Sequence, residues 1–462
     1  AQAAQALHAR VLQDAADPAL GAAAGEIEFL LNHDQLTGLS NRQALARSIA
    51  RGLAGWRRDG TQTLVAAINL DKFKRLNEAL GHHAGDQALV AVTWSLQAVL
   101  RPEDLLARIG NDEFVVLMPG LGDDSVARDR LRQIMQAVHR EIEAPAGGAI
   151  PLTCSIGYAI FPHDGEDADA LLGNATLAMR RAKLAGGGQV QHFTEALKQA
   201  FSRKLALESQ LRAALEQREL FLVYQPKIAL KDGSVAGLEV LLRWRHPQHG
   251  LISPAEFIPV AEEAGLIVEI GVWVLKSAVD QCRAWRASGV PAVPVAVNLS
   301  ARQFHGTDIV GCVEAVLRGA GLAPGDLELE LTESTSVENP ERSAGLMARL
   351  RGLGCRLSID DFGTGYSSLS YLKQLPVDKL KIDISFVRDM HQSAESLAMV
   401  KAIIAMAHGL HLEVIAEGVE LQAQLDGLRA AGCDQIQGFY FSKPLEPDDC
   451  AAYLRDHAAP VH

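Results

Sequence analysis

The sequence predicts an α/β protein built from two domains of different architecture. Its second half alternates strands and helices through eight strands, which is the pattern of a (β/α)₈ TIM barrel. Its first half places two strand–helix units around a central hairpin, which predicts an open sheet with helices on one side. The 462 residues are sufficient for two or three domains.

Composition narrows the possible functions. Hydrophobic residues make up 48 % of the chain and charged residues 22 %, as in ordinary soluble proteins. The net charge of −12 argues against binding a nucleic acid polymer or an anionic membrane, although local cations could still hold a phosphorylated ligand. The six cysteines form no C-x-x-C pair and no apolar run has transmembrane length, so we expect a cytoplasmic location. Because the chain starts at Ala1 rather than Met, we also expect an upstream sensory domain.

The first domain is predicted from local periodicity. Residues 1–33 are Ala-rich with apolar positions at helical spacing, which indicates a helical stalk. Residues 34–193 form the first domain, with strands expected at 64–70, 106–118, 151–161 and 189–193 and helices at 125–143 and 171–184. The pair Gly110-Asn111 suits a tight hairpin turn in which both residues have positive φ.

A connector and a barrel follow. Residues 194–218 predict a rigid linker helix that buries Leu197, Phe201, Leu205 and Leu211. Residues 219–462 form the barrel, with strands near 220–230, 235–243, 293–299, 327–332, 356–360, 379–384, 413–417 and 436–441. Only Lys231-Asp-Gly233 separates the first two strands, which is too short for a crossover helix. We therefore expect the first strand to run antiparallel to the second.

Two adjacent acids, Asp360 and Asp361, end the strand that starts at Arg356. Neighbouring carboxylates repel one another unless a cation lies between them, and a divalent metal ion is the usual solution. A solvated Asp-Asp turn before Gly363 is the alternative, because this is good turn chemistry. The rest of the barrel favours the metal site.

Polar residues recur at or near successive strand ends, where the active sites of barrels form. They are Gln225, Glu239, Asn298, Glu330, Thr332, Glu333, Asp360, Asp361, Lys381, Asp383, Glu417, Glu420 and Gln437. The candidate ligands are all oxygen donors, which suits Mg²⁺ or Mn²⁺ rather than zinc. Two such cations together with Lys381 suit the hydrolysis of a phosphodiester.

The barrel resembles the EAL family of cyclic di-GMP phosphodiesterases over its whole length. The matching motifs are Tyr224-Gln-Pro226, Glu239-Val-Leu241, Leu242-Arg-Trp244, Asn298-Leu-Ser300, Glu330-Leu-Thr-Glu333, Asp360-Asp-Phe-Gly-Thr-Gly365, Lys381-Ile-Asp383, Glu417-Gly-Val-Glu420 and Gln437-Gly438. The resemblance implies hydrolysis of cyclic di-GMP to linear pGpG. A non-catalytic cyclic di-GMP receptor is the alternative, and the complete set of metal ligands favours the enzyme.

The same resemblance implies a role for each site residue. Glu239, Asn298, Glu330, Asp360 and Asp361 would bind two metal ions, with Asp360 bridging them. Lys381 would contact water and phosphate, and Glu417 would orient water or act as base. Glu333 would hold the loop after Asp361 and couple it to a homodimer. Ligand contacts are expected from Gln225, Arg243, Thr332, Asp383, Glu420 and Gln437.

The first domain resembles the GGDEF domain of diguanylate cyclases. The matches are Asp34-x-Leu-Thr-Gly-Leu-x-Asn-Arg42, Phe73-Lys74, Asn77, Gly81-His82, Gly85-Asp86 and Arg108-Ile-Gly-Asn-Asp-Glu-Phe114. The family fold is a palm-like, ferredoxin-like sheet of the nucleotidyl cyclase type. Two positions depart from the family, because Asn69 replaces a metal-binding Asp and Asn111 replaces a glycine of the name motif. A neutral amide is a poor Mg²⁺ ligand, and a side chain at Asn111 would obstruct phosphates that approach the backbone.

We therefore expect a degenerate domain that does not cyclise GTP but can bind it as a regulator. The expected GTP contacts are Asn77, Asp86, Asp112 and Lys183, although Gly187 stands where the family has an Arg. A purely structural or dimerising domain and a bifunctional cyclase/phosphodiesterase are the alternatives. Arg101 and Asp104 match the inhibitory R-x-x-D site that binds cyclic di-GMP, although Asp104 also suits a turn.

Overall fold

The computed structural model describes residues 29–121, 124–143, 149–320, 324–337, 339–363 and 372–457. The predicted stalk therefore lies outside the described residues except for a short helical stretch at 29–32. The chain divides into two compact units at residues 203 and 204, within the predicted linker helix. The two units are described separately below.

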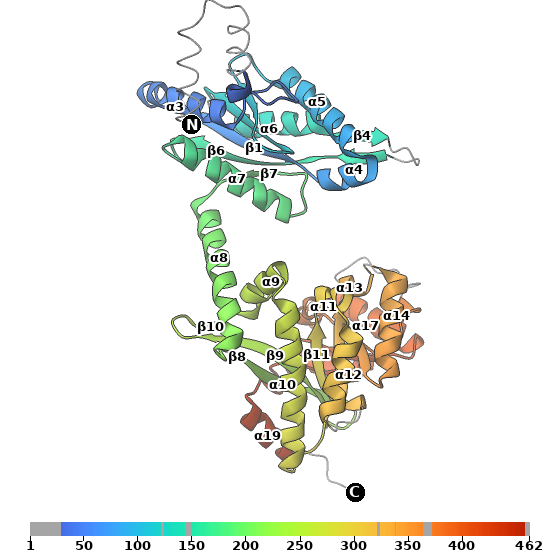
Figure 1. The fold of residues 1–462 in the computed structure, drawn as a ribbon. Helices are drawn as coiled ribbons and strands as arrows, with labels where there is room; N and C mark the ends of the chain where they lie inside the picture. The colour runs from blue at the N-terminus through green and yellow to red at the C-terminus, as the bar shows by residue number, and fades with distance from the viewer. Residues whose placement is uncertain are drawn as a thin grey trace, which may run out of the picture. The chain divides into compact units, whose positions relative to one another are not determined.

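The first unit is built on a five-stranded sheet with the order β2-β3-β1-β6-β7. Its strands are β1 Thr63–Leu70, β2 Leu105–Arg108, β3 Glu113–Pro119, β6 Cys154–Phe161 and β7 Val190–His192. Strands β1, β6 and β7 of this sheet are labelled in Figure 1. The central strand β1 pairs antiparallel with both β3 and β6, and all eight of its residues are buried. A strand without an exposed face must be covered by other elements on both sides of the sheet.

Helices do cover both faces of this sheet, so the prediction of helices on one side is wrong. The helices are α3 Arg42–Asp59, α4 Phe73–Leu80, α5 His82–Val99, α6 Asp124–Val138 and α7 Ala168–Leu184. Leu64 and Ile68 of β1 belong to a core with α4, α5 and α6. Val65 and Ala67 belong to a second core with α3 and α7. The error arose because a strand buried on both faces has no polar alternation to reveal the second layer.

Three local predictions in the first unit are also corrected. The helix expected at 125–143 ends at Val138, because residues 140–143 form β4 and pair with β5 Ala149–Leu152. The strand expected at 151–161 is divided at Thr153 between β5 and β6. The hairpin between β2 and β3 exists, but neither Gly110 nor Asn111 has positive φ. Four residues, 109–112, separate the two strands, so the two-residue turn that demands positive φ is absent here.

The linker helix is α8, Glu195–Glu216, and its C-terminal half packs on the second unit. The buried residues of α8 are Leu207, Leu211 and Ala214. Of the four predicted positions only Leu211 is buried, and Leu205 is 52 % exposed. The buried face differs from the predicted one because Leu207, Leu211 and Ala214 pack in the core of the second unit, and Leu205 lies outside that core.

The second unit is a closed eight-stranded barrel. Its strands are β8 Leu220–Ala229, β9 Val235–His246, β11 Val295–Leu299, β12 Leu327–Thr332, β13 Arg356–Phe362, β14 Lys379–Ile382, β15 Glu413–Ala416 and β16 Gln435–Ile436. Strand β8 pairs antiparallel with both β9 and β16, while the pairs from β9 through β16 are parallel. The predicted reversal of the first strand is thus confirmed. Gly233 makes the turn possible, with φ of 76° and its amide bonded to Ala229.

Helices surround the barrel. They are α9 Pro254–Ala264, α10 Ile267–Ala287, α11 Ala301–Gly306, α12 Ile309–Ala320, η1 Pro324–Asp326, α13 Glu333–Val337, α14 Pro340–Gly352, α16 Ile384–Arg388, α17 Ala394–Gly409, α18 Gln422–Ala431 and α19 Pro447–Asp456. A short strand β10, Gly250–Ile252, pairs antiparallel with the end of β9 and was not predicted. The last strand ends at Ile436 rather than 441, and Gly438 just beyond it packs so closely on the backbone of Val419 that a Cβ would lie 2.1 Å from its carbonyl oxygen.

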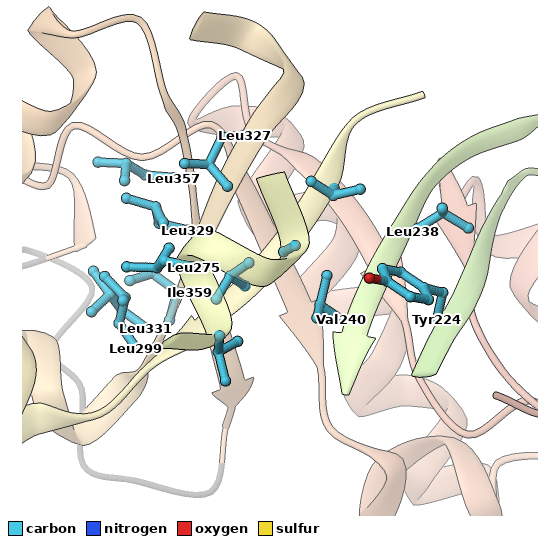
Figure 2. Packing of buried hydrophobic residues seen from close by; sticks show 14 of the residues in the cluster. Tyr224, Leu238, Val240, Leu275, Leu299, Leu327, Leu329, Leu331, Leu357 and Ile359 are labelled. Atoms are coloured by element: carbon cyan, nitrogen blue, oxygen red, sulfur yellow. The ribbon is translucent and has the colours of Figure 1, made fainter. Parts of the chain in front are cut away.

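The strands divide their side chains between two environments. Leu327, Leu329 and Leu331 of β12 point outward and pack with Leu357 and Ile359 of β13 in the layer beneath the helices (Figure 2). The residues between them on the same strands are polar and charged and point into the barrel. The hydrophobic core of this unit therefore lies between the strands and the surrounding helices. The interior of the barrel is polar and holds the candidate site. No helix among the residues with described structure has the length and apolar character needed to cross a bilayer.

Candidate active site in the barrel

Lys381 lies at the centre of the acidic side chains in the barrel. Its Nζ is 2.7 Å from Glu330, 2.9 Å from Asp360 and 2.6 Å from Glu417. A fourth carboxylate, Glu239, lies 3.7 Å away. Burial by itself would lower the pKa of Lys381, but the four carboxylates raise that pKa well above its ordinary value. Lys381 is therefore a permanent positive charge at the floor of the site.

The strand register explains this convergence. Glu239 is level with Gln225 on β8 and with Ala296 on β11, while Asn298 is level with Glu330 on β12. Strands β9, β11 and β12 end at the mouth of the barrel where the antiparallel β8 begins, so residues distant in sequence become neighbours. Carboxylate oxygens of Glu239, Glu330 and Asp360 lie within 4.8 Å of one another, as do those of Asp360, Asp361 and Glu417.

The two acid groups have the chemistry of a site for hard divalent cations. All donors are oxygens, which fits Mg²⁺ or Mn²⁺. Burial and the charges of Asp360 and Glu239 raise the pKa of Glu417 to about 8, although Lys381 opposes this shift. Burial and the charges of Asp360 and Asp383 likewise raise the pKa of Asp361. The site thus holds more negative charge than Lys381 balances, and divalent cations would relieve that excess.

The backbone at Asp361 lets two adjacent carboxylates serve one site. Successive residues of a regular strand point to opposite faces, so Asp360 and Asp361 could not otherwise converge. Asp361 has φ of 55°, and the pairing of β13 with β14 shifts register between Ile359 and Phe362. A left-handed conformation is costly for a residue other than glycine, and such strain is characteristic of functional sites.

Amide side chains and Glu333 support the acids. Asn298 donates from Nδ2 to one oxygen of Glu239 at 2.8 Å, and Gln437 donates from Nε2 to the other at 2.6 Å. The amide oxygen of Asn298 is the atom that could join a cation. Glu333 accepts a hydrogen bond of 2.8 Å from the backbone amide of Gly363, two residues beyond Asp361.

The predicted ligand contacts divide into three groups. Gln225 and Gln437 are buried and joined by a hydrogen bond of 3.0 Å beside Glu239. Arg243 and Thr332 line a cavity of about 520 Å³ that also borders Asn298 and is otherwise largely apolar. This combination suits a flat ring system next to charged groups.

The other two predicted contacts are placed differently. Asp383 caps α16, where one of its oxygens accepts from the backbone amide of Ser385 at 2.9 Å. Glu420 is exposed on the segment between β15 and α18. Neither residue belongs to the acid groups that converge on the site.

Sequence reasoning missed three charged residues deeper in the barrel. Lys227, Glu328 and Lys379 are almost completely buried and joined to one another by ion pairs of 2.9 and 2.8 Å. A signal was available, because Glu328 and Lys379 each precede a predicted site residue by two positions. Period-two spacing places each pair on the same face of its strand.

Two family models match the chain. The model of the EAL domain matches residues 208–444, and the model described as "Diguanylate cyclase, GGDEF domain" matches residues 31–189. The chain is a tandem GGDEF–EAL protein. Recognition of both families from their motifs is thereby confirmed.

Similar proteins share this tandem arrangement. NbdA of Pseudomonas aeruginosa, named a cyclic di-GMP phosphodiesterase, is 42 % identical over 92 % of this chain and 54 % of its own length. MucR of the same organism, named a bifunctional diguanylate cyclase/cyclic di-GMP phosphodiesterase, is 40 % identical over 92 % of this chain and 62 % of its own. The chain therefore spans about half to three fifths of the length of these relatives.

Solved structures agree with both domains. The PaMucR phosphodiesterase in complex with c-di-GMP is 46 % identical, covers 53 % of this chain and 99 % of that structure, and has a TM-score of 0.52. A GGDEF–EAL structure of Vibrio cholerae LapD has a TM-score of 0.55 over 92 % of this chain and 99 % of that one. Because its identity is only 19 %, that likeness concerns the fold alone.

The GGDEF domain brings its two departures from the family together with the acids of its signature. Asn69 is paired with Glu113 across β1 and β3, and the amide of Leu70 donates to the carbonyl of Asp112. The Oδ1 atom of Asn69 is buried without a hydrogen-bond partner. No three acidic, histidine or cysteine side chains in the described part of this domain converge as they do in the barrel.

Asp71, the aspartate that directly follows β1, is engaged in hydrogen bonds within the domain. Its carboxylate accepts hydrogen bonds from Thr153, Ser155 and the backbone amide of Gly188 at 2.7–2.9 Å. A carboxylate committed to three donors joins β1, β6 and the loop before β7. These three hydrogen bonds give Asp71 a structural role at this strand end.

The predicted GTP contacts come from four different elements of the first unit. Asn77 on α4 has a buried Oδ1 without a partner and packs over Gly85. Asp86 is exposed on α5, Asp112 lies in the β2–β3 hairpin, and Lys183 is in the last turn of α7. The hairpin is held by Arg108, which donates to the carbonyl of Asn111 at 2.7 Å and to Asp34 at 2.8 Å.

The predicted inhibitory pair is partly engaged within the domain. The side chain of Asp104 is fully buried and forms an ion pair with Arg130 of α6. Its carboxylate also accepts a hydrogen bond of 2.8 Å from the backbone amide of Arg101. This bond stabilises the turn at 101–104, which is the role expected of Asp104 if it does not bind cyclic di-GMP. Arg101 itself is half exposed. The partner Arg130 was not predicted.

Proposed function

We propose that the EAL barrel hydrolyses cyclic di-GMP to linear pGpG. The observation that carries this proposal is the convergence of Glu239, Glu330 and Asp360 with Asp361 and Glu417 around Lys381. The names of NbdA and of PdeR from Escherichia coli, both cyclic di-GMP phosphodiesterases, support the choice of substrate.

Two divalent cations, Mg²⁺ or Mn²⁺, would occupy the site. The residues that would hold them are Glu239, Asn298, Glu330, Asp360 and Asp361. Such cations supply a Lewis acid for the phosphoryl oxygens and lower the pKa of water. The oxygen-only donors and the unbalanced negative charge fit this assignment.

The protein's own groups then have separate tasks. Glu417 lies 2.6 Å from Lys381 at the edge of the acid group and orients the attacking water, whose proton it can accept. Lys381 balances negative charge that develops on the phosphate. Glu333 holds the segment from Asp361 to Gly363 through its hydrogen bond to the Gly363 amide.

Substrate binding uses the mouth of the barrel. Arg243 and Thr332 border the cavity of about 520 Å³, where they would hold one guanine nucleotide beside the acids. Gln225 on the adjacent strand β8 and Gln437 just after β16 would contact the substrate beside Glu239. Asp383 and Glu420 would contact it from the segments that follow β14 and β15.

The GGDEF domain is proposed to regulate this activity without making cyclic di-GMP. An amide at Asn69 and three hydrogen bonds on Asp71 leave the end of β1 without an available carboxylate. Asn77, Asp86, Asp112 and Lys183 would contact GTP. Bifunctional activity is the second candidate, because MucR carries that name at 40 % identity.

The test is the product formed from cyclic di-GMP by the purified chain. We expect chromatography to detect pGpG with Mg²⁺ or Mn²⁺ present and none after chelation with EDTA. Binding of cyclic di-GMP without any pGpG, under metal-replete conditions, would replace the enzyme with a receptor.

A further inference from the structure

The interior of the barrel holds an unbroken series of buried ion pairs below the acidic site. Lys379 lies 2.8 Å from Glu328, and Glu328 lies 2.9 Å from Lys227. Lys227 in turn lies 2.6 Å from Glu330, which contacts Lys381 at 2.7 Å. The four linking residues below Lys381 are at most 2 % exposed, so water does not screen them.

Lys227 is the residue that joins the two levels of this series. It comes from β8, the strand that runs opposite to the others, and its Nζ contacts both Glu328 and Glu330. Those two acids are two positions apart on β12. Glu330 belongs to the acidic site, and Glu328 lies in the buried layer below it. Of these two acids, Lys379 contacts only Glu328 and Lys381 contacts only Glu330, among the described ion pairs.

The contact with Glu330 restricts its carboxylate. Lys227 holds Oε1, while Lys381 holds Oε2. With Oε1 held from below, the carboxylate cannot rotate about its last bond without breaking a charged hydrogen bond in a dry environment. Oε2 therefore stays on the side of Asp360 and Glu417, which contact the same lysine.

We propose that Lys227 is a positioning residue for the cation site, which it serves by holding Glu330 so that Oε2 faces the other acids. The proposal deepens the function proposed above, since it concerns the same site. Groups that orient metal ligands from behind typically contribute 10- to 100-fold to metal affinity. We therefore expect loss of Lys227 to weaken Mn²⁺ binding by roughly tenfold or more.

Each of the two acids has another partner besides Lys227. Glu328 already has Lys379 at 2.8 Å and a hydrogen bond of 3.2 Å from Ser358. Glu330 already has Lys381. Either acid would thus keep one partner without Lys227, and the position between them is what distinguishes this lysine.

The test measures Mn²⁺ binding to the purified chain without substrate, using the electron paramagnetic resonance signal of free Mn²⁺. Three variants are compared with the wild type: Lys227→Met, the charge-compensated Lys227→Met/Glu328→Gln, and Lys379→Met as the matched control. Thermal unfolding of each variant reports stability separately. The Mn²⁺ concentration that half-activates pGpG formation is a second readout.

The expected result is weaker Mn²⁺ binding in both variants that lack Lys227, with stability recovered in the double variant. Lys379→Met should keep the wild-type affinity for Mn²⁺ while losing stability. Unchanged or tighter Mn²⁺ binding in the folded double variant would overturn the proposal. If the wild type bound Mn²⁺ but formed no pGpG, the proposed function would fail while this comparison remained decisive.

Discussion

Glu333 accepts a hydrogen bond of 2.8 Å from the backbone amide of Gly363 and so ties the start of α13 to the end of β13. The contact spans thirty positions of sequence and lies two residues beyond Asp361. A hydrogen bond from an amide to a charged carboxylate contributes about 1.5–3 kcal/mol to the stability of the folded state. Here the bond restrains the segment that carries the strained Asp361.

Glu333→Ala is expected to lower kcat for pGpG formation by about tenfold or more, because 1.4 kcal/mol of lost positioning corresponds to a factor of ten. Glu333→Gln keeps an acceptor oxygen and should retain most of the rate. Steady-state kinetics of both variants check this. An alanine variant with wild-type kcat would show that the bond does not serve the site.

Glu239→Ala is expected to abolish hydrolysis. The substitution removes a candidate cation ligand and the hydrogen-bond acceptor that Asn298 and Gln437 share. The measurement is pGpG formation at saturating Mg²⁺. The matched control is Glu413→Gln, which should remain active. Glu413 is half-exposed and is the first residue of β15, at the end of that strand away from Glu417. Retained activity in Glu239→Ala would contradict the assignment of cation ligands.

GTP is expected to change the rate of cyclic di-GMP hydrolysis. The motive is that Asn77 keeps a buried Oδ1 without a partner, while an amide stands at Asn69 on the neighbouring strand β1. Asn77→Ala and Asp86→Ala should remove the response to GTP, and ATP in place of GTP is the control. Equal rates with and without saturating GTP would eliminate the regulatory proposal.

Asn69→Asp combined with Asn111→Gly is expected to give detectable synthesis of cyclic di-GMP from GTP and Mg²⁺. The new carboxylate would stand opposite Glu113, where an amide oxygen is now buried without a partner. The assay uses a Glu239→Ala background so that product is not consumed. A folded variant that makes no product would place the defect elsewhere, with Gly187 the next position to change.

Gly157→Ala is expected to destabilise the GGDEF domain by about 1–3 kcal/mol or more, as overpacking of a close contact does. A Cβ at this position would lie 1.8 Å from the Met179 nitrogen and 2.4 Å from the Ala175 carbonyl oxygen, both in the backbone of α7. Gly173 lies in α7 itself, and a Cβ at that position would have nothing within 4 Å. Gly173→Ala should therefore stabilise the domain by about 0.5–1 kcal/mol. Calorimetry compares the two, and equal unfolding temperatures would contradict the argument.

The sequence alone determined the features that depend on local periodicity and turn chemistry. Alternating strands and helices predicted the barrel, and Lys231-Asp-Gly233 predicted its reversed first strand. Acids at strand ends predicted a cation site, because strands that end at one mouth bring their last residues together.

Only the tertiary structure decided which atoms meet. The left-handed Asp361 turns both aspartates to one side, against the alternation that a strand predicts. The role of Lys227 depends on closure of the barrel, since a residue on β8 reaches Glu330 only across the interior. The second helical layer of the GGDEF domain was likewise hidden, because a strand buried on both faces looks the same in sequence whichever helices cover it. Periodicity is a short-range property of the chain, whereas these contacts follow from register and packing between distant segments.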